Sequence, residues 1–463
     1  MTQLVWLRND LRMTDHPAFE QALSLHSTDS PVAAVHIATP KQWQQHNESP
    51  AKLGLRAALL QQLQQQLAAR GIELYLLEAD WFSECAEHLA ELCAELHCSN
   101  IHWITETPWN ECQRDLQTES HLRSKGIQCH IQAVDQLVSE PVLNQQGLPY
   151  KVFTPFYRRW LQLMQNTDQT VHCSLPETTI QTSQLMPLPD WASDFRDDLW
   201  PADTKSIHHR LQHFCQLKLA SYGGHRDIPS EPATSQISPY LALGAIGPRE
   251  LLSAMRNSKW GADYWMESDW LRELAWRDFY RQLLSHFPLL NKHQPFKTET
   301  LNLQWHNTPS HWRAWCNGQT GFPIIDAAMR QLLQTGWMHN RLRMLTASFL
   351  TKLLFQDWRK GEVFFMQHLI DGDFAANNGG WQWSASTGCD AAPYFRVFNP
   401  IRQSEKFDSE GRFIRRFLPE LASLDDRSIH FPSGEQRRKC SYPDAIIDYS
   451  SSRQHAIDQF RNL

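Results

Sequence analysis

The chain has 463 residues, of which 41% are apolar and 20% are charged, and its net charge is −6. A single core stops growing at roughly 250–300 residues, so we expect at least two domains, and the composition excludes a wholly disordered chain. No apolar stretch approaches the roughly 20 residues that span a bilayer, and the first residues lack the basic and apolar regions of a signal peptide, so we expect a cytoplasmic protein.

The charge is distributed unevenly along the chain. Residues 1–200 contain 13 Lys and Arg against 24 Asp and Glu, whereas residues 201–463 contain 31 against 26. A polyanion is therefore expected to bind the second half of the chain. The ten cysteines are scattered without a Cys-x-x-Cys pair, which indicates reduced thiols and predicts no metal site.

The first part of the chain, residues 1–135, alternates short apolar runs with helical patterns. Five runs predict strands, at 4–7, 32–38, 72–77, 101–105 and 129–134. Helical spacing lies between them, at 51–70 and 81–97. The alternation is typical of a parallel, Rossmann-like α/β domain, although the usual glycine-rich dinucleotide and triphosphate loops are absent.

The remaining chain changes character twice. Residues 136–201 are rich in Pro, Thr, Gln and Asp, with little periodicity across 165–189, so we expect a connector that runs over the surface. From 202 to 463 the pattern is almost wholly helical. The sequence thus predicts an α/β domain, a connector and an all-α domain.

Two segments of the helical region carry polar groups that could bind a ligand. Thr234-Ser235-Gln236-Ile237-Ser238 is a hydroxyl-rich turn that enters a helix, which suits a phosphate, although an ordinary N-cap is the alternative. Glu273 and Trp276 are three residues apart and share a helix face. They could hydrogen-bond and stack an unpaired nucleobase, or they could belong to a helical core.

A third segment runs from Asp371 to Trp383 with the sequence DGDFAANNGGWQW. Two acids, two amides and three glycines within ten residues are poor core material, because buried polar groups need partners. A packed polar cofactor would supply those partners.

These segments, together with the N-terminal run Trp6 to Arg12 and the segments 336–344 and 393–400, resemble the DNA photolyase and cryptochrome family over nearly the whole chain. The resemblance is closest to microbial (class I) photolyases that act on cyclobutane pyrimidine dimers. It implies an N-terminal antenna domain, a C-terminal helical domain that binds FAD, and a carbon–carbon lyase activity on ultraviolet-damaged DNA. We expect a monomer with no obligate protein partner.

The resemblance implies a set of residues around the FAD. They are Tyr222, Thr234, Ser235, Gln236, Ile237, Ser238, Trp270, Arg277, Asn340, Arg343, Asp371, Gly372, Asp373 and Asn377. Arg343 and Asp371 are expected near the flavin ring, where a positive charge favours the anionic reduced form. Asn377 resembles the residue that faces flavin N5, and its amide cannot release a proton, which favours repair over signalling.

The family uses light to pass one electron from reduced flavin to a dimer, which must first leave the DNA helix, because photolyases are base-flipping enzymes. By similarity, Glu273 and Asn340 hydrogen-bond the lesion, Trp276 and Trp383 form an aromatic wedge, and Met344 lines the site. Residues expected at the DNA also include Arg226, Arg277, Arg341, Arg396 and Gln403.

Two further sets follow from the resemblance. Trp381, Trp358 and Trp305 match the family's chain that carries an electron to oxidised flavin, although each alone could be core packing. His46, Asn110, Glu111 and Lys292 match positions that contact methenyltetrahydrofolate as an antenna. A deazaflavin or an empty cleft is the alternative, and Asn110-Glu111 is also typical of a helix N-terminus.

Three other functions are alternatives to the repair of cyclobutane dimers. Asn377 argues against a cryptochrome-type light receptor. Met344 stands where a photolyase for the pyrimidine-pyrimidone photoproduct would carry a histidine. A flavin-carrying DNA-binding protein without repair activity stays open, because binding and catalysis use the same residues.

Overall fold

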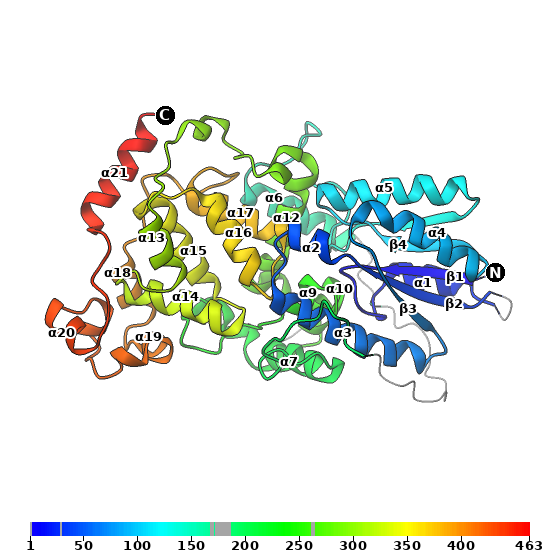
Figure 1. Cartoon of the computed structure of the whole chain (residues 1–463), viewed down its shortest axis with the longest axis horizontal. Helices are drawn as coiled ribbons and strands as arrows, with labels where there is room; N and C mark the ends of the chain where they lie inside the picture. The colour runs from blue at the N-terminus through cyan, green and yellow to red at the C-terminus, as the bar shows by residue number, and fades with distance from the viewer. Residues whose placement is uncertain (1, 28–29, 167–170, 172–186, 261–263) are drawn as a thin grey trace. The chain divides into compact units, whose positions relative to one another are not determined.

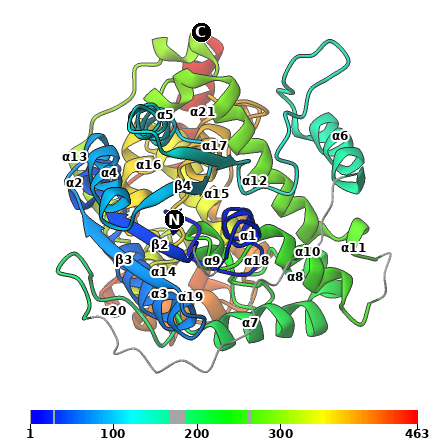
Figure 2. The same cartoon turned by 90° about the vertical axis from the view of Figure 1, so that its right-hand side faces the viewer.

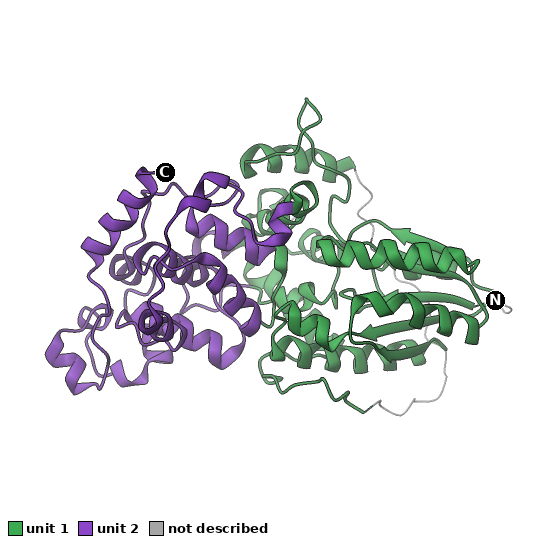
Figure 3. Cartoon of the chain, turned by 45° about the horizontal axis from the view of Figure 1, so that its top comes forward, with its two compact units in different colours: residues 1–220, 235–288, 370–375 green, residues 221–234, 289–369, 376–463 purple. Residues whose placement is uncertain are grey.

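The structure is a computed structural model that describes residues 2–27, 30–166, 171, 187–260 and 264–463 (Figure 1). It forms two compact units, coloured separately in Figure 3. Unit 1 comprises residues 1–220, 235–288 and 370–375, and unit 2 comprises 221–234, 289–369 and 376–463. The boundaries predicted at 135 and 201 come from changes in the sequence pattern, whereas each compact unit combines several separate segments of the chain. The predicted domain boundaries therefore stay a prediction.

Unit 1 contains a five-stranded parallel sheet in the order β3-β2-β1-β4-β5. The strands are β1 (Thr2–Leu7), β2 (Val32–Ala38), β3 (Glu73–Glu78), β4 (Cys98–Ile104) and β5 (Gln128–Gln132). Every neighbouring pair is parallel. All five predicted strands and the predicted α/β class are confirmed, with shifts of a few residues at the strand ends.

The helices that connect these strands cover the sheet and bury its apolar side chains. They are α1 (Pro17–Ser24), α2 (Pro40–Gln45), α3 (Pro50–Ala68), η1 (Phe82–Glu84), α4 (Cys85–Glu95) and α5 (Trp109–Ser124). In Figure 1, α4 and α5 lie on the opposite side of the sheet from α3, and Figure 2 gives the same arrangement. The α3 helix begins where the Ser49 side chain accepts a hydrogen bond from the Lys52 backbone N–H and Pro50 occupies the first turn.

The connector contains a helix that the sequence analysis did not predict. α6 (Phe153–Asn166) buries Phe153, Phe156, Trp160 and Met164 at helical spacing. Its partner is α12 (Asp269–His286), where Phe279 meets Phe156 at 5.0 Å and Asp278 accepts a 2.9 Å hydrogen bond from Trp160. The connector predicted over 136–201 thus carries a helix in its first half, and residues 167–170 and 172–186 of it lie outside the described residues.

Short helices complete unit 1. They are α7 (Thr204–Leu217), η2 (Leu219–Ser221, whose last residue belongs to unit 2), α9 (Ser238–Ala242), α10 (Pro248–Arg256) and α11 (Tyr264–Glu267). The Asp203 side chain caps α7 by accepting from the Ser206 backbone N–H.

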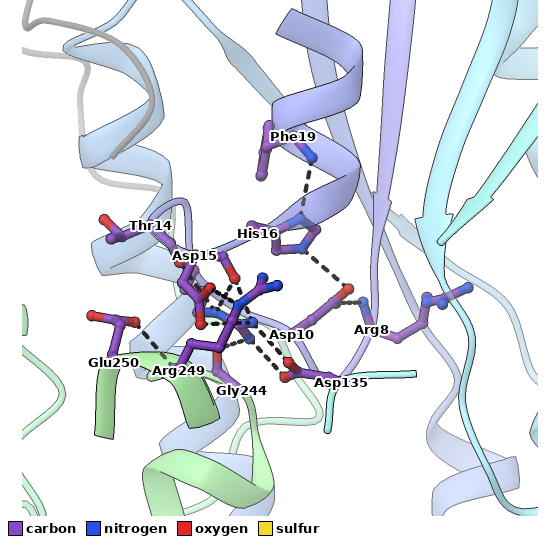
Figure 4. Close-up of polar contacts among 12 residues, drawn as sticks. Arg8, Asp10, Thr14, Asp15, His16, Phe19, Asp135, Gly244, Arg249 and Glu250 are labelled. Carbon is purple, nitrogen blue, oxygen red and sulfur yellow. Dashed lines mark hydrogen bonds and ion pairs between the residues drawn. The ribbon is translucent and has the colours of Figure 1, made fainter. Parts of the chain in front are cut away.

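The N-terminal motif after β1 is held by a buried polar network within unit 1 (Figure 4). The Arg12 guanidinium donates to both oxygens of Asp135 at 3.0 and 3.1 Å and to the backbone carbonyl of Gly244 at 3.2 Å. Arg249 of α10 pairs with Asp15 in the same network. The charged residues of the motif therefore tie the loop after β1 to later segments of this unit.

Unit 2 is helical, as predicted, around one large apolar core. Its helices include α8 (Tyr222–His225), η3 (Pro288–Lys292, which starts in unit 1), η4 (Thr298–Asn302), α13 (Pro309–Cys316), α14 (Pro323–Thr335), α15 (Asn340–Ser348), a π-helical turn (Phe349–Leu353) and α16 (Trp358–His368). They continue with α17 (Phe374–Ala385, whose first two residues belong to unit 1), α18 (Pro400–Phe407), α19 (Arg412–Phe417), η6 (Pro419–Leu421), η7 (Ser428–His430), α20 (Gly434–Lys439) and α21 (Tyr449–Arg461). Trp315, Trp358 and Trp381 are all buried in this core.

Candidate functional site

The residues expected around the cofactor and the lesion fall in both units. Unit 1 contains His46, Asn110, Glu111, Ser235, Gln236, Ile237, Ser238, Trp270, Glu273, Trp276, Arg277, Asp371, Gly372 and Asp373. Unit 2 contains Tyr222, Arg226, Thr234, Lys292, Trp305, Asn340, Arg341, Arg343, Met344, Trp358, Asn377, Trp381, Trp383, Arg396 and Gln403.

In unit 1, the hydroxyl-rich turn and the acidic loop lie together. The Ser238 hydroxyl donates to Asp371 at 2.6 Å, although the two residues are far apart in the sequence. Ser238 is the first residue of α9, and Gln236 before it has a left-handed backbone with φ of 52°. The loop thus places the buried Asp371 carboxylate beside a turn that is rich in hydroxyl groups.

Two basic residues that the sequence analysis missed hold the same loop. Arg281 of α12 forms a 2.9 Å ion pair with Asp373, and Lys52 of α3 donates at 2.9 Å to the backbone carbonyl of Gly372. Arg281 lies one helical turn after Arg277, so the i,i+4 spacing was a signal that could have identified it. Lys52 had no such signal, because its contact bridges 320 residues of sequence.

The α12 face carries Glu273, Trp276 and Arg277, each partly buried. The Trp276 ring stacks on Phe153 of α6 with a centroid distance of 3.6 Å and an interplanar angle of 6°. Phe153 therefore covers one face of the indole, which sequence spacing alone could not reveal. Burial, with the nearby charge of Arg281, lowers the pKa of Arg277 to about 10, and its guanidinium donates at 2.8 Å to the Asp135 carbonyl. Trp270, which starts the same helix, is buried against Phe214 with a centroid distance of 4.7 Å.

The expected antenna residues of unit 1 come together. The His46 ring lies 2.9 Å from the Asn110 amide nitrogen and 3.5 Å from a Glu111 carboxylate oxygen. Burial by itself would lower the pKa of His46, but the hydrogen bond and charge of Glu111 outweigh it and raise the pKa. Lys292 is exposed at the end of η3 in unit 2.

A cavity of about 20 Å³ adjoins this cluster in unit 1, at the carboxyl ends of β1 and β2, and Glu111 is one of its lining residues. Its lining includes Arg8, Trp43, Arg56, Phe82 and Arg114. A volume of this size holds about one water molecule, so the chain's own side chains fill most of the space at this edge of the sheet.

In unit 2, the helix α15 and its neighbours carry the basic residues expected at the DNA. Arg341 pairs with Asp227, and its guanidinium lies 4.4 Å from the centroid of the Phe407 ring. Arg343 donates to the Met338 carbonyl at 2.8 Å, while Asn340 at the start of α15 is exposed. Met344 is partly buried one helical turn after Asn340.

The other candidate residues of unit 2 range from buried to exposed. Arg226 lies over the buried Tyr222 ring at 5.6 Å, and Thr234 is half-buried. Arg396 is exposed, and Gln403 is half-buried on α18. Trp383 on α17 is also half-buried.

Asn377 is oriented by a residue that the sequence analysis missed. Its amide nitrogen donates at 2.9 Å to the backbone carbonyl of Glu362 on α16. The amide oxygen accepts no hydrogen bond from the residues that the structure describes. The side chain therefore presents an acceptor whose direction is set by the helix behind it.

The three tryptophans of the expected electron chain all belong to unit 2, with Trp358 and Trp381 in its core and Trp305 packed against it. Trp381 is 2% exposed and packs on Phe365 at 4.9 Å, and Trp358 is 1% exposed at the start of α16. Trp305 is only half-buried and packs on Phe355 at 4.9 Å, three residues before Trp358. Burial therefore decreases from Trp381 and Trp358, which are buried, to Trp305, which is partly exposed to solvent.

Neither a metal centre nor a membrane span is found in the part of the chain that the structure describes. No three His, Cys, Asp or Glu side chains gather there as metal ligands. No described helix is long and apolar enough to cross a membrane.

Comparison with known proteins bears on both parts of the chain. The family model for DNA photolyase matches residues 3–177, and the model for the FAD binding domain of DNA photolyase matches residues 270–462. The deoxyribodipyrimidine photo-lyase of Escherichia coli K12 is 42% identical over 98% of this chain and 97% of its own length. The enzyme of that name from Vibrio cholerae is 42% identical over 99% of both chains.

Solved structures agree with this assignment. A bacterial class III photolyase from Agrobacterium tumefaciens matches with a TM-score of 0.86 and 32% identity, covering 100% of this chain and 97% of its own. A cryptochrome from Synechocystis matches with a TM-score of 0.85 and 26% identity, covering 99% of this chain and 98% of its own. The chain belongs to the DNA photolyase family, and its helical C-terminal region is that family's FAD-binding domain.

Proposed function

We propose that this protein repairs cyclobutane pyrimidine dimers in DNA with light, as a deoxyribodipyrimidine photo-lyase that carries reduced FAD. The full-length similarity to enzymes of that name supports the reaction. The observation that carries the proposal within this chain is Asn377, whose amide is held by the Glu362 carbonyl and presents only a neutral oxygen.

The donor set of the chain fits a flavin dinucleotide. Asn377 offers an acceptor to an N–H donor such as flavin N5, and Asp371 and Asp373 offer carboxylates that Ser238 and Arg281 hold in place. Tyr222, the turn 234–238, Trp270, Arg277, Asn340, Arg343 and Gly372 complete the proposed binding residues. When bound, reduced FAD would absorb light and supply the electron that opens the dimer.

The chain's own residues orient the reactants and control protons. Asn377 has no proton to release at neutral pH, so the reduced cofactor keeps its negative charge. Glu273 and Asn340 would hydrogen-bond the base edges of the extruded lesion, with Trp383 and Met344 as apolar lining. Because Phe153 covers one face of Trp276, this indole would offer its other face or its edge to the lesion.

Trp381, Trp358 and Trp305 would restore the reduced cofactor by passing an electron inward from solvent. Their graded burial supports this role, because a hole that reaches Trp305 lies near a reductant in solution. The contact between Phe355 and Trp305 keeps the outer indole beside the segment that leads to Trp358.

A folate antenna, 5,10-methenyltetrahydrofolate, would bind at His46, Asn110 and Glu111 together with Lys292. The cluster that His46 forms with Asn110 at 2.9 Å and with Glu111 at 3.5 Å supports a polar binding site there. The cavity of about 20 Å³ that Glu111 also lines has room for about one water molecule and is too small for a chromophore.

The DNA contacts are proposed at Arg226, Arg341, Arg396 and Gln403, with Arg277 nearer the lesion. We also propose that the protein is a cytoplasmic monomer without an obligate protein partner.

The proposal is tested with irradiated oligonucleotides and purified protein that carries FAD. Dimers should disappear under near-ultraviolet or blue light and persist in the dark, as measured by chromatography of the digested DNA. Equal dimer loss in light and dark, or none in either, would contradict the proposal.

The similarity to a cryptochrome favours one second candidate, a light receptor. The two functions differ in what Asn377→Asp should do. A repair enzyme should lose stable reduced flavin and light-dependent repair, whereas a receptor shows no repair before or after the change.

A further inference from the structure

A buried carboxylate lies directly behind Asn377 in unit 2. Glu362 is 1% exposed, and its carboxylate accepts a 2.8 Å hydrogen bond from the Asn378 amide while its backbone carbonyl accepts from Asn377. Its second carboxylate oxygen lies 2.7 Å from Nδ1 of His293. Glu362 therefore contacts both amides of the flavin segment and one histidine.

His293 is held in an unusual backbone conformation that aims its ring at Glu362. It follows η3 directly and has a left-handed φ of 54°, which a residue other than Gly rarely adopts. Its backbone carbonyl accepts a 2.8 Å hydrogen bond from Arg359, one turn before Glu362 on α16. The imidazole is 43% exposed, so the pair joins solvent to a buried site.

The far side of the network is also fixed. The Asn378 amide oxygen accepts a 2.9 Å hydrogen bond from Gln382, and the Gln382 amide oxygen accepts one of 2.9 Å from the Phe296 backbone N–H. Both asparagine amides are consequently oriented by bonds within unit 2, so a change in charge at Glu362 acts on a rigid array.

We propose that His293 is a positioning residue of the flavin site: as a cation it neutralises the Glu362 carboxylate and so sets the electrostatic potential at the cofactor that Asn377 faces. This inference rests on the proposed function. His293 would add to the flavin site a titratable group that is in contact with solvent.

The physical reason is the sign of the charges. A buried carboxylate without a counter-charge disfavours further negative charge nearby, including that of reduced flavin, whereas a neutral pair does not. The hydrogen bond and charge of Glu362 raise the pKa of His293, against partial burial and the charge of Arg359. Arg359 is itself paired with Asp357 at 3.2 Å, and Lys292 is exposed beside the histidine.

The test uses the FAD-loaded full chain and compares wild type with His293→Asn, Glu362→Gln and the double variant. Asn is chosen because it tolerates the left-handed backbone at this position and carries no charge. The measurements are the one-electron midpoint potential of the bound flavin from about pH 6 to about pH 9, and the His293 titration by NMR of histidine-labelled protein.

At the acidic end, His293→Asn should disfavour one-electron reduction about tenfold, equivalent to a potential about 59 mV lower. The difference from wild type should fade as the pH rises through the His293 pKa, because both proteins then carry an uncompensated Glu362. Removing the carboxylate in the double variant should restore the potential, and Glu362→Gln alone should lower the His293 pKa.

Equal potentials for wild type and His293→Asn across this range would overturn the proposal, as would a loss that the double variant does not restore. A matched control is His121→Asn, which breaks a 3.1 Å surface pair with Glu87 in unit 1 and should leave the potential unchanged. Failure of the inference is distinct from failure of the proposed function, because wild type would then still repair dimers in light.

Discussion

Trp381 meets Gly361 in a contact that has no room for a methyl group. A Cβ atom on Gly361 would lie 2.1 Å from the Trp381 ring and 2.7 Å from Leu350. Trp358 lies three residues before Gly361 on α16, so Trp358 and Gly361 share one face of this helix. A single glycine thus permits Trp381 to pack closely against the helix that carries Trp358.

Gly361→Ala should therefore displace Trp381 and lower the free energy of unfolding by about 1–3 kcal/mol, as overpacked cores do. Chemical denaturation measures this change. Gly224→Ala is the control, because no atom lies within 4 Å of the added methyl group there. Equal stabilities of the two variants would show that α16 and α17 can separate without cost.

Trp305→Phe should slow photoreduction of oxidised flavin by at least about tenfold, since a phenyl ring is far harder to oxidise than indole, while chemically reduced protein should repair dimers normally. Flash absorption spectroscopy and a repair assay measure the two effects. Trp260→Phe removes an indole of unit 1 that is 38% exposed, and it should change neither rate. Unchanged photoreduction in Trp305→Phe would remove this residue from the chain.

At the scale of elements, the loop between β1 and α1 depends on buried charges. Asp10 accepts from the Arg8 backbone N–H at 2.6 Å and lies 3.2 Å from His16, whose other ring nitrogen caps α1 by accepting from Phe19. Burial alone would raise the pKa of Asp10, but the hydrogen bond and charge of His16, with the charge of Arg8, hold it well below its usual range. The ionised carboxylate therefore stabilises the fold.

Asp10→Asn should lower the free energy of unfolding at neutral pH by about 2 kcal/mol. A depressed pKa contributes stability above the unfolded value of about 3.9, and this is lost as the pH falls through the folded value. The difference between wild type and variant should thus shrink below about pH 4. Thermal unfolding across pH checks this, with the exposed Asp198→Asn as a control of much smaller effect.

The local sequence pattern was sufficient to predict some elements of the fold and not others. The five strands were predicted because each is a short apolar run between helical segments, and that signal is local. α6 was missed because its apolar residues, such as Phe153 and Trp160, stand in a segment whose composition indicates a loop. Their burial against α12 stabilises the helix, and that partner lies more than 100 residues away.

For the whole molecule, the charge distribution predicts salt-dependent binding. If three arginines contact phosphates, binding of damaged DNA should weaken about 40-fold between 50 and 200 mM salt, because counterions are released on binding. Arg396→Ala should lower the slope of log K against log salt by about one, measured by fluorescence anisotropy.

Arg461→Ala is the control for this prediction, since Arg461 is also exposed in unit 2 but pairs with Asp458 at 3.4 Å near the chain end. It should leave the slope unchanged. Identical slopes for wild type and Arg396→Ala would exclude this residue from the phosphate contacts.

The sequence by itself determined the α/β and helical parts of this protein, its family and the run Asp371 to Trp383, because periodicity and motif are local properties. Only the tertiary structure decided which charged residues from elsewhere in the chain lie close to that run. Glu362, His293, Lys52 and Arg281 reach the flavin segments through contacts between residues distant in sequence, or through a backbone turn that no pattern predicted. Their charges act through space, and the fold alone sets those distances.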